Sequence, residues 1–177
     1  FVGSTWSKNF YNDRKMYIMD IDGSNLKCVT NDLDQIPSSA IWANNSSKVY
    51  FNVREYGQSN IYSADLMGKV KKVTKGDHML TMTDLVGSNA VASWSNPSNP
   101  NDIVSFSVEK TNNIKRLTEV NKDIFYNVEF GQIEEITYKS VDNKKVQGWI
   151  VKPPQFNSKK KYPLVLRIHG GPHSMYN

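Results

Sequence analysis

The sequence predicts a mostly β-stranded chain in two parts: a partial β-propeller over residues 1–132 and the beginning of a different sheet over residues 133–177. Two observations predict the propeller. A short segment recurs three times at a regular interval, and each copy follows a run in which apolar and polar residues alternate. A change of pattern predicts the second part, because a longer strand pair and a nearly continuous apolar run replace the repeat.

The repeat is clearest at its end, where an apolar residue is followed by threonine. The three pairs begin at residues 29, 73 and 117, so they are 44 residues apart in both cases. Before each pair lie a strand-like run and a turn containing Gly or Asn, which is the pattern of a β-hairpin. The three runs are Met16–Asp20, Asn60–Ala64 and Ile103–Val108.

A tryptophan stands further upstream in each copy, before a turn rich in Ser, Asn and Pro. The spacing of Trp6, Trp42 and Trp94 is uneven, so the loops vary while the final hairpin keeps its register. A period near 44 residues has room for about four short strands, as in a propeller blade. Three copies are too few to close a ring of about 4–8 blades. We therefore expect the C-terminal blades of a larger propeller, with the tryptophans packed between blades.

A β-sandwich in which the spacing is coincidental is the alternative interpretation of the first part. Three strands that end in register at the same interval favour the propeller instead. One blade cannot bury both of its faces, so the propeller interpretation requires neighbouring copies to stack.

A different pattern begins after Thr118. One further strand is predicted over Ile124–Phe130, and a strand pair joined by a polar turn follows over Ile133–Lys139 and Val146–Lys152. A Pro-Pro sequence ends the pair, since proline cannot donate a ladder hydrogen bond. The apolar run Leu164–Ile168 is then expected to form a strand buried on both faces of an α/β sheet. Soon after it come two glycines, which allow unusual backbone angles and a close approach of substrate to main-chain N–H groups.

The order of these features resembles the prolyl oligopeptidase family of serine peptidases, and most closely its acylaminoacyl-peptidase-like branch. Propeller blades precede an antiparallel strand pair that ends in Pro-Pro, and residues 162–172 read Tyr-Pro-Leu-Val-Leu-Arg-Ile-His-Gly-Gly-Pro. The resemblance covers the whole chain and is strongest over residues 133–173. It implies the C-terminal blades of a β-propeller followed by the first strands of an α/β-hydrolase sheet.

The resemblance also implies a role for the Gly-Gly loop. In an α/β-hydrolase the loop after the third strand supplies one main-chain N–H of the oxyanion hole. Carried over to this sequence, Gly171 would be that donor, His169 and Gly170 would shape the loop, and Pro172 would fix its exit. The tyrosine hydroxyl used in the dipeptidyl-peptidase-like branch has no clear match here. Neither His169 nor His173 is expected to be the catalytic base, because the family's Ser, Asp and His all follow this loop.

No nucleophile motif accompanies the loop. The 177 residues contain no Gly-x-Ser-x-Gly sequence, and the family's triad residues would lie beyond Asn177. Phe1 is not preceded by an initiator Met, so the natural N-terminus is expected to lie outside this sequence as well. We therefore expect an inactive fragment of an active serine peptidase. The resemblance implies that the parent hydrolyses short peptides, of acylaminoacyl or dipeptidyl type, through an acyl-enzyme.

Two other function classes stay open. One is a non-catalytic propeller binding module whose tail merely retains a hydrolase-like beginning, and the other is an esterase of the same hydrolase fold. A nucleophile motif would separate a hydrolase from the binding module, and relative turnover of acyl-peptides and simple esters would separate peptidase from esterase. The expected partners are a short peptide substrate and either the remainder of the hydrolase domain or further copies of this chain, joined through open strand edges.

Charge and hydropathy argue against two other kinds of partner. The net charge of +5 comes from 22 Lys and Arg against 17 Asp and Glu. The basic residues gather in two short, separate clusters, which are predicted to be solvated turns, so no nucleic-acid partner is expected. No apolar run approaches the ~20 residues of a membrane span, so no membrane partner is expected either. The clusters are Lys69, Lys71, Lys72 and Lys75, and Lys159, Lys160 and Lys161.

Cysteine and histidine usage predicts neither metal nor cofactor. Cys28 is the single cysteine, which excludes an intramolecular disulfide framework and a multi-cysteine zinc site. The histidines, His78, His169 and His173, form no compact ligand motif. A lone cysteine favours a reducing compartment, so a cytoplasmic location is expected.

Overall fold

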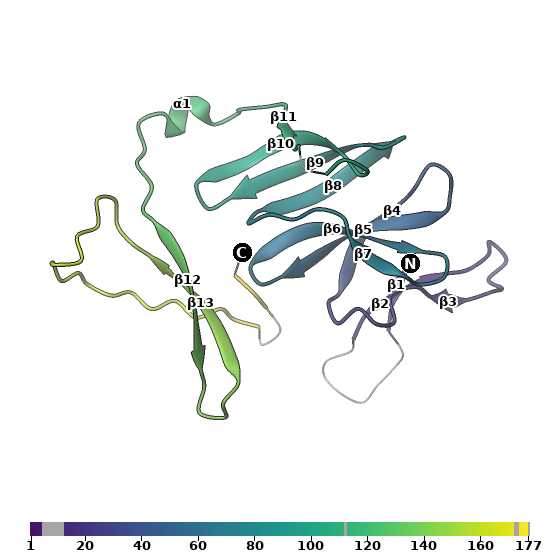
Figure 1. Cartoon of the computed structure of the whole chain (residues 1–177), viewed down its shortest axis with the longest axis horizontal. Coiled ribbons are helices and arrows are strands. Elements are labelled where there is room, and N and C mark those ends of the chain that lie inside the picture. Colours follow the sequence, from purple (N-terminus) through teal and green to yellow (C-terminus); the bar gives the residue numbers. More distant parts are fainter. Residues whose placement is uncertain (5–12, 112, 172–173, 177) are drawn as a thin grey trace. The chain divides into compact units, whose positions relative to one another are not determined.

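The computed structural model describes residues 1–4, 13–111, 113–171 and 174–176 (Figure 1). These residues form two compact units, Phe1–Val120 and Asn121–Tyr176, which are described separately. Strands are the main regular secondary structure of both units, and the only helix among the described residues, α1 (Lys122–Phe125), has four residues. The mostly β fold predicted from the sequence is therefore confirmed. The change of domain expected between residues 132 and 133 stays a prediction.

The first unit consists of three antiparallel groups of strands, which we call blades 1, 2 and 3 (Figure 1). Blades 2 and 3 are four-stranded meanders in which each strand pairs with the next along the chain. One parallel pair, Ser59 with Met79, joins them. Blade 1 contains β1 (Val2–Gly3), β2 (Lys15–Ile18) and β3 (Lys27–Cys28); blade 2 contains β4 (Pro37–Trp42), β5 (Lys48–Glu55), β6 (Gln58–Asp65) and β7 (Val70–Lys72); blade 3 contains β8 (Met79–Val86), β9 (Asn89–Asn96), β10 (Asn99–Ser107) and β11 (Lys115–Arg116).

The recurring threonines close the end of each blade. In every blade the main-chain N–H of one strand residue donates to the threonine hydroxyl, at 2.8, 2.8 and 2.9 Å. The apolar residue before the threonine donates its own N–H to the carbonyl of that same strand residue. The ladder therefore continues one step past the short outer strand, with a side chain as acceptor. The pairs are Met16–Thr30, Ile61–Thr74 and Ile103–Thr118.

The turns before the outer strands of blades 1 and 2 are also alike. Gly23 and Gly68 have φ angles of 86° and 89°, which L side chains rarely adopt. Their N–H groups donate to the carbonyls of Asp20 and Asp65 at 2.9 and 3.0 Å. The sequence signal of Gly in a hairpin turn therefore reflects a backbone conformation that glycine adopts without strain.

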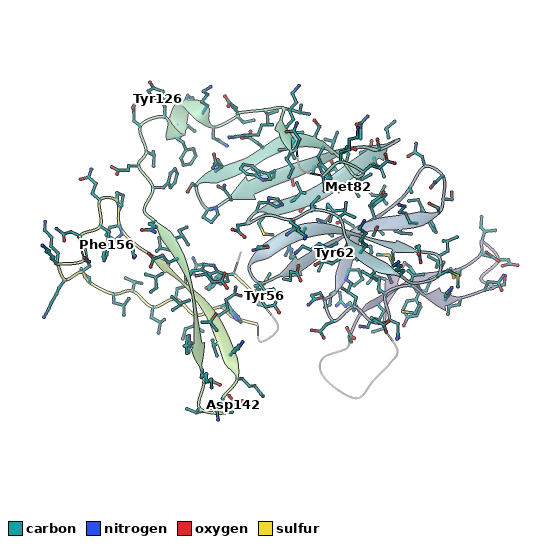
Figure 2. All side chains as sticks on the ribbon, viewed as in Figure 1. Tyr56, Tyr62, Met82, Tyr126, Asp142 and Phe156 are labelled. Atoms are coloured by element: carbon teal, nitrogen blue, oxygen red, sulfur yellow. The ribbon has the colours of Figure 1, made fainter. Side chains whose placement is uncertain are left out.

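Blade 2 is buried on both faces, because successive side chains of β5 point to opposite sides. Phe51 enters a core shared with blade 1, where its ring stacks on Tyr62 with centroids 6.2 Å apart. Tyr50 enters a second core, shared with blade 3, that also contains Met82. Figure 2 labels Tyr62 and Met82, one residue from each core. The first core comprises Met16, Val29, Leu33, Val49, Phe51, Val53, Tyr62 and Ala64, and the second Ala43, Tyr50, Ile61, Leu80, Met82, Leu85, Ala90, Ala92, Val104, Phe106 and Val108.

Side chains supply most of the hydrogen bonds between blades 2 and 3. Asn52, which is buried, donates to the carbonyl of Leu80 and accepts from the N–H of Met82 at 3.2 Å. The hydroxyl of Ser59 donates to the same Leu80 carbonyl at 2.9 Å, and its N–H donates to the carbonyl of His78 at 2.8 Å. The buried polar side chains of Asn52 and Ser59 are thus paired, as a stable interior requires.

The second unit is built around one hairpin. β12 (Ile133–Lys139) and β13 (Lys145–Val151) pair without a register shift, and Asp142 lies at the tip (Figure 2). The strand pair predicted here is confirmed, with the second strand beginning one residue earlier. Where the chain enters the hairpin, a Cβ at Gly131 would lie 1.7 Å from the carbonyl oxygen of Lys152. Only glycine fits this close approach.

Two strands predicted in this unit are wrong. Residues 124–130 do not form a strand: the chain turns through α1, and Phe125 stacks on Phe130 at 5.5 Å. Residues 164–168 have no regular secondary structure, and Leu164 and Val165 are 91% and 87% exposed. A strand buried on both faces needs partner strands and covering helices, and no described residue pairs with this run.

The tryptophans meet the prediction of blade packing only in part. Trp94 packs against the core between blades 2 and 3. Trp42 is 49% exposed, because Ile41 and Ala43 on either side of it take the inward positions at the end of β4. Trp6 lies outside the described residues.

Candidate active site

The predicted oxyanion loop belongs to the second unit and directly follows the exposed apolar run. His169, Gly170 and Gly171 are described and exposed, whereas Pro172 lies outside the described residues. None of the three belongs to a helix or strand. The conformation of this loop therefore depends on local side-chain contacts.

Tyr176 makes most of these contacts. Its hydroxyl accepts a hydrogen bond from Arg167 Nε at 2.9 Å and donates to the carbonyl of Ile168 at 3.3 Å. The Arg167 guanidinium lies 4.7 Å from the centre of the Tyr176 ring, within the range of a cation–π contact. The same ring meets His169 edge-on, with centroids 6.0 Å apart. The chain thus folds back around Tyr176, which positions the residues before the two glycines.

The two glycines present accessible main-chain groups. Gly171 has a φ of 152°, which favours glycine, and a Cβ at Gly170 would have no heavy atom within 4 Å. Within the described part of the chain, no group accepts a hydrogen bond from the N–H of either glycine. In its Nδ1–H tautomer, His169 donates to the carbonyl of Gly170 at 3.0 Å. An oxyanion hole requires main-chain N–H groups that are free to donate to the oxyanion. The N–H groups of Gly170 and Gly171 have no acceptor among the described residues and can therefore make such a bond.

Sequence reasoning assigned no role to Arg167 or Tyr176. The only signal for their contact is an arginine and an aromatic residue on either side of a short Gly-Gly-Pro loop. That signal is weak, because such pairs interact only when the chain folds back.

Asp102 is a buried carboxylate of blade 3, and its role is structural. It accepts hydrogen bonds from Arg116, from the N–H of Val120 at 3.0 Å and from the hydroxyl of Thr118 at 2.7 Å. These bonds, the one from Arg116 foremost, lower the pKa of Asp102 to about 2. The carboxylate stays charged at neutral pH and ties β10 to the segment that closes the blade.

Glu55 in blade 2 is bound in a similar way. Burial alone would raise its pKa, but hydrogen bonds from Lys72 and Tyr62 outweigh burial and hold the pKa below its usual value. The same burial and the bond to Glu55 raise the pKa of Tyr62. The prediction that Lys72 belongs to a solvated turn is therefore wrong, because this lysine pairs with Glu55 and lies 5.6 Å from the centre of the Tyr62 ring.

Two kinds of feature are absent from the described ranges. No group of three or more His, Cys, Asp or Glu residues is placed there to hold a metal ion. In the same ranges, no helix is both long and apolar enough to cross a bilayer.

Comparison with known proteins identifies relatives over nearly the whole chain. No model of a known protein family matches the sequence. The uncharacterized peptidase YuxL of Bacillus subtilis (strain 168) is 28% identical over 92% of this chain and 27% of its own length. Dipeptidyl-peptidase 5 of Porphyromonas gingivalis is 24% identical over 91% of this chain and 24% of its own length. The chain thus spans about a quarter of the length of these relatives.

Solved structures agree with the sequence relatives. An acylaminoacyl peptidase in complex with Z-Gly-Gly-Phe-chloromethyl ketone matches 92% of this chain, and this chain covers 24% of it, with a TM-score of 0.73 and 26% identity. The β-propeller domain of the trilobed protease from Pyrococcus furiosus matches 72% of the chain, which covers 36% of that domain, with a TM-score of 0.53 and 24% identity. The second match concerns the fold alone.

Proteins that are similar to most of this chain in sequence and in structure are thus named as peptidases. The chain is related to the peptidases of the prolyl oligopeptidase family, as its sequence predicts.

Proposed function

We propose that this chain is part of a serine peptidase that hydrolyses short peptides through an acyl-enzyme. The observation that carries the proposal is the loop of His169, Gly170 and Gly171, which has exposed, unused N–H donors and follows propeller blades in a relative of peptidases. Acyl transfer needs such donors, because negative charge develops on the carbonyl oxygen only as the tetrahedral intermediate forms.

In this proposal the main-chain N–H of Gly171 stabilises the oxyanion. His169, Gly170 and Pro172 shape the loop, and Tyr176 positions it from the side through its contacts with Arg167 and His169. The second N–H of an oxyanion hole comes from the residue after the nucleophile in this kind of hydrolase. The sequence contains no Gly-x-Ser-x-Gly motif, so these 177 residues alone are expected to be inactive.

The proposed substrates are peptides with an acylated or a free N-terminus. The support comes from the relatives, which are named as dipeptidyl-peptidase and acylaminoacyl peptidase, one of them holding a peptidyl chloromethyl ketone. The propeller would restrict access to the active site and so exclude folded proteins.

Fluorophosphonate labelling of the full-length protein, followed by peptide mapping, tests the proposal. We expect the label on a serine within a Gly-x-Ser-x-Gly peptide, because that serine is the activated nucleophile. Turnover of acyl-peptides well above that of simple esters would then separate a peptidase from an esterase. Folded protein that takes up no label would contradict the proposal and favour a non-catalytic propeller module.

A further inference from the structure

A cleft of about 690 Å³ lies in the first unit, between β5–β7 of blade 2 and Val108, Glu109, Thr111 and Ile114 of blade 3. This volume is within the range of small-molecule sites. One carboxylate, Glu109, is among the described lining residues, against several cationic side chains. The cationic residues are Lys48, Lys71, Lys72 and Lys75.

Among the described residues, three of these lysines have no ion-pair partner. Lys72 is already paired with Glu55. Among the described residues, no carboxylate lies within ion-pair distance of Lys48, Lys71 or Lys75. Like charges gathered around one concave surface raise the local potential and attract anions.

His78 provides an independent observation at the same place. Its side chain lines the cleft and is only 8% exposed, and its Nε2 has no hydrogen-bond partner in the described structure. Buried polar atoms are nearly always paired, so an unpaired one marks a position where a ligand can complete the hydrogen bonding.

The backbone at Gly76 fixes the position of the His78 ring, and burial favours its neutral form. A Cβ at Gly76 would lie 2.4 Å from His78 Cε1, so the ring packs directly on the backbone at Gly76. Burial lowers the pKa of His78, Asp77 opposes that shift, and Lys72 adds to it. The lowered pKa favours the neutral ring, which in its Nε2–H tautomer can donate one hydrogen bond from Nε2.

We propose that this cleft binds a small organic anion carrying two or more phosphate or carboxylate groups, with Lys48, Lys71 and Lys75 supplying the charge and His78 a hydrogen bond. Ammonium groups and a ring N–H are suitable donors for both kinds of oxygen. The residues involved all belong to the first unit, so this inference does not depend on the proposed peptidase activity.

Isothermal titration of the intact protein with citrate and with pyrophosphate, at constant ionic strength, tests the proposal. We expect saturable binding of at least one probe, weakened about tenfold by Lys71→Gln and similarly by Lys75→Gln, because each change removes a charge-assisted hydrogen bond. Lys69→Gln is the matched control: Lys69 is exposed in the same basic cluster of the sequence and does not line the cleft. Its affinity should equal that of the unmodified protein.

A spectroscopic measurement reports on His78 directly. In long-range ¹H–¹⁵N spectra, the Nε2 resonance of His78 should shift with the same saturation curve, while the ring of His169 should not respond. Absence of saturable binding for both probes would overturn the proposal. Equal loss of affinity in Lys69→Gln and Lys71→Gln would overturn it too, because it would show only general attraction to a basic surface.

Discussion

The two units contain similar strand-forming residues but bury them to very different extents. In blade 2, Phe51, Val53 and Ile61 are fully buried, whereas in the second unit Leu164 and Val165 are almost fully exposed. Blade 2 stacks between blades 1 and 3, so both of its faces meet another sheet, but a lone hairpin has no second layer to cover it. Apolar alternation therefore predicts where a strand can form, and neighbouring sheets decide whether it is buried.

Truncation of the blade core should give the largest effect. Phe51→Ala is expected to lower the free energy of unfolding by about 3–5 kcal/mol, because it removes a fully buried ring and leaves a cavity. Denaturant unfolding monitored by circular dichroism measures this change. Leu166→Ala in the second unit is the matched control and should change stability by about 0.5 kcal/mol or less, since Leu166 is exposed. Equal losses from the two variants would contradict the contrast between the units.

Substitution at Gly171 should affect chemistry more than stability. In the full-length protein, Gly171→Ala is expected to lower kcat about 10²–10³-fold, because a side chain at a φ of 152° forces the backbone to move and misdirects the N–H. Gly23→Ala in blade 1 is the control, with a φ of 86° and no catalytic role. It should cost about 1–2 kcal/mol of stability and leave kcat unchanged. An unchanged kcat in the Gly171 variant would show that the N–H of Gly171 is not part of the oxyanion hole.

Loss of a closing threonine should destabilise the blades by a smaller amount. Thr74→Val keeps the shape but leaves the buried N–H of Ile61 without its acceptor, at an expected cost of about 1–3 kcal/mol. Faster amide exchange at Ile61 would locate the effect. Thr137→Val, on the exposed face of β12, should change stability by less than about 0.5 kcal/mol. Similar results at both positions would show that the repeat threonine is dispensable.

The smallest expected effect is a change in pH dependence. The pKa of Asp102 is lowered from 3.8 to about 2, so its carboxylate stabilises the fold above about pH 4 and loses that contribution as the pH falls towards 2. Asp102→Asn should therefore flatten the decline of unfolding free energy over this interval. Asp142→Asn, at the exposed hairpin tip, should alter the slope less, because surface ion pairs contribute little. An identical slope in unmodified and Asp102→Asn protein would contradict this account.

The sequence predicted the blades well because their signal is local and repeated. The interval between Thr30, Thr74 and Thr118 located three hairpin ends, and the alternation over Ile133–Lys139 gave a strand with its observed limits. The pairing itself also follows from short turns, which bring adjacent strands together. What the interval did not reveal is that the threonine hydroxyl accepts a strand N–H.

The failures arise where structure depends on distant residues. Leu164–Ile168 has the composition of a buried strand, but such a strand forms only with partners that no local pattern supplies. The inward positions at Ile41 and Ala43 leave Trp42 exposed, although a large aromatic residue in a repeat suggests a core position. The contact of Tyr176 with Arg167 likewise requires residues nine positions apart to come together, and no local pattern in the sequence predicts that contact.

The closing threonine has a consequence for how such proteins evolve. Each 44-residue copy carries its own final acceptor, so every backbone closure is completed within the copy and not borrowed from the next one. A gene segment of this length can therefore be duplicated or deleted in frame while each remaining copy keeps the acceptor of its own closing N–H group. A change in the number of blades then depends on how well the new neighbouring faces fit and on the hydrogen bonds between them.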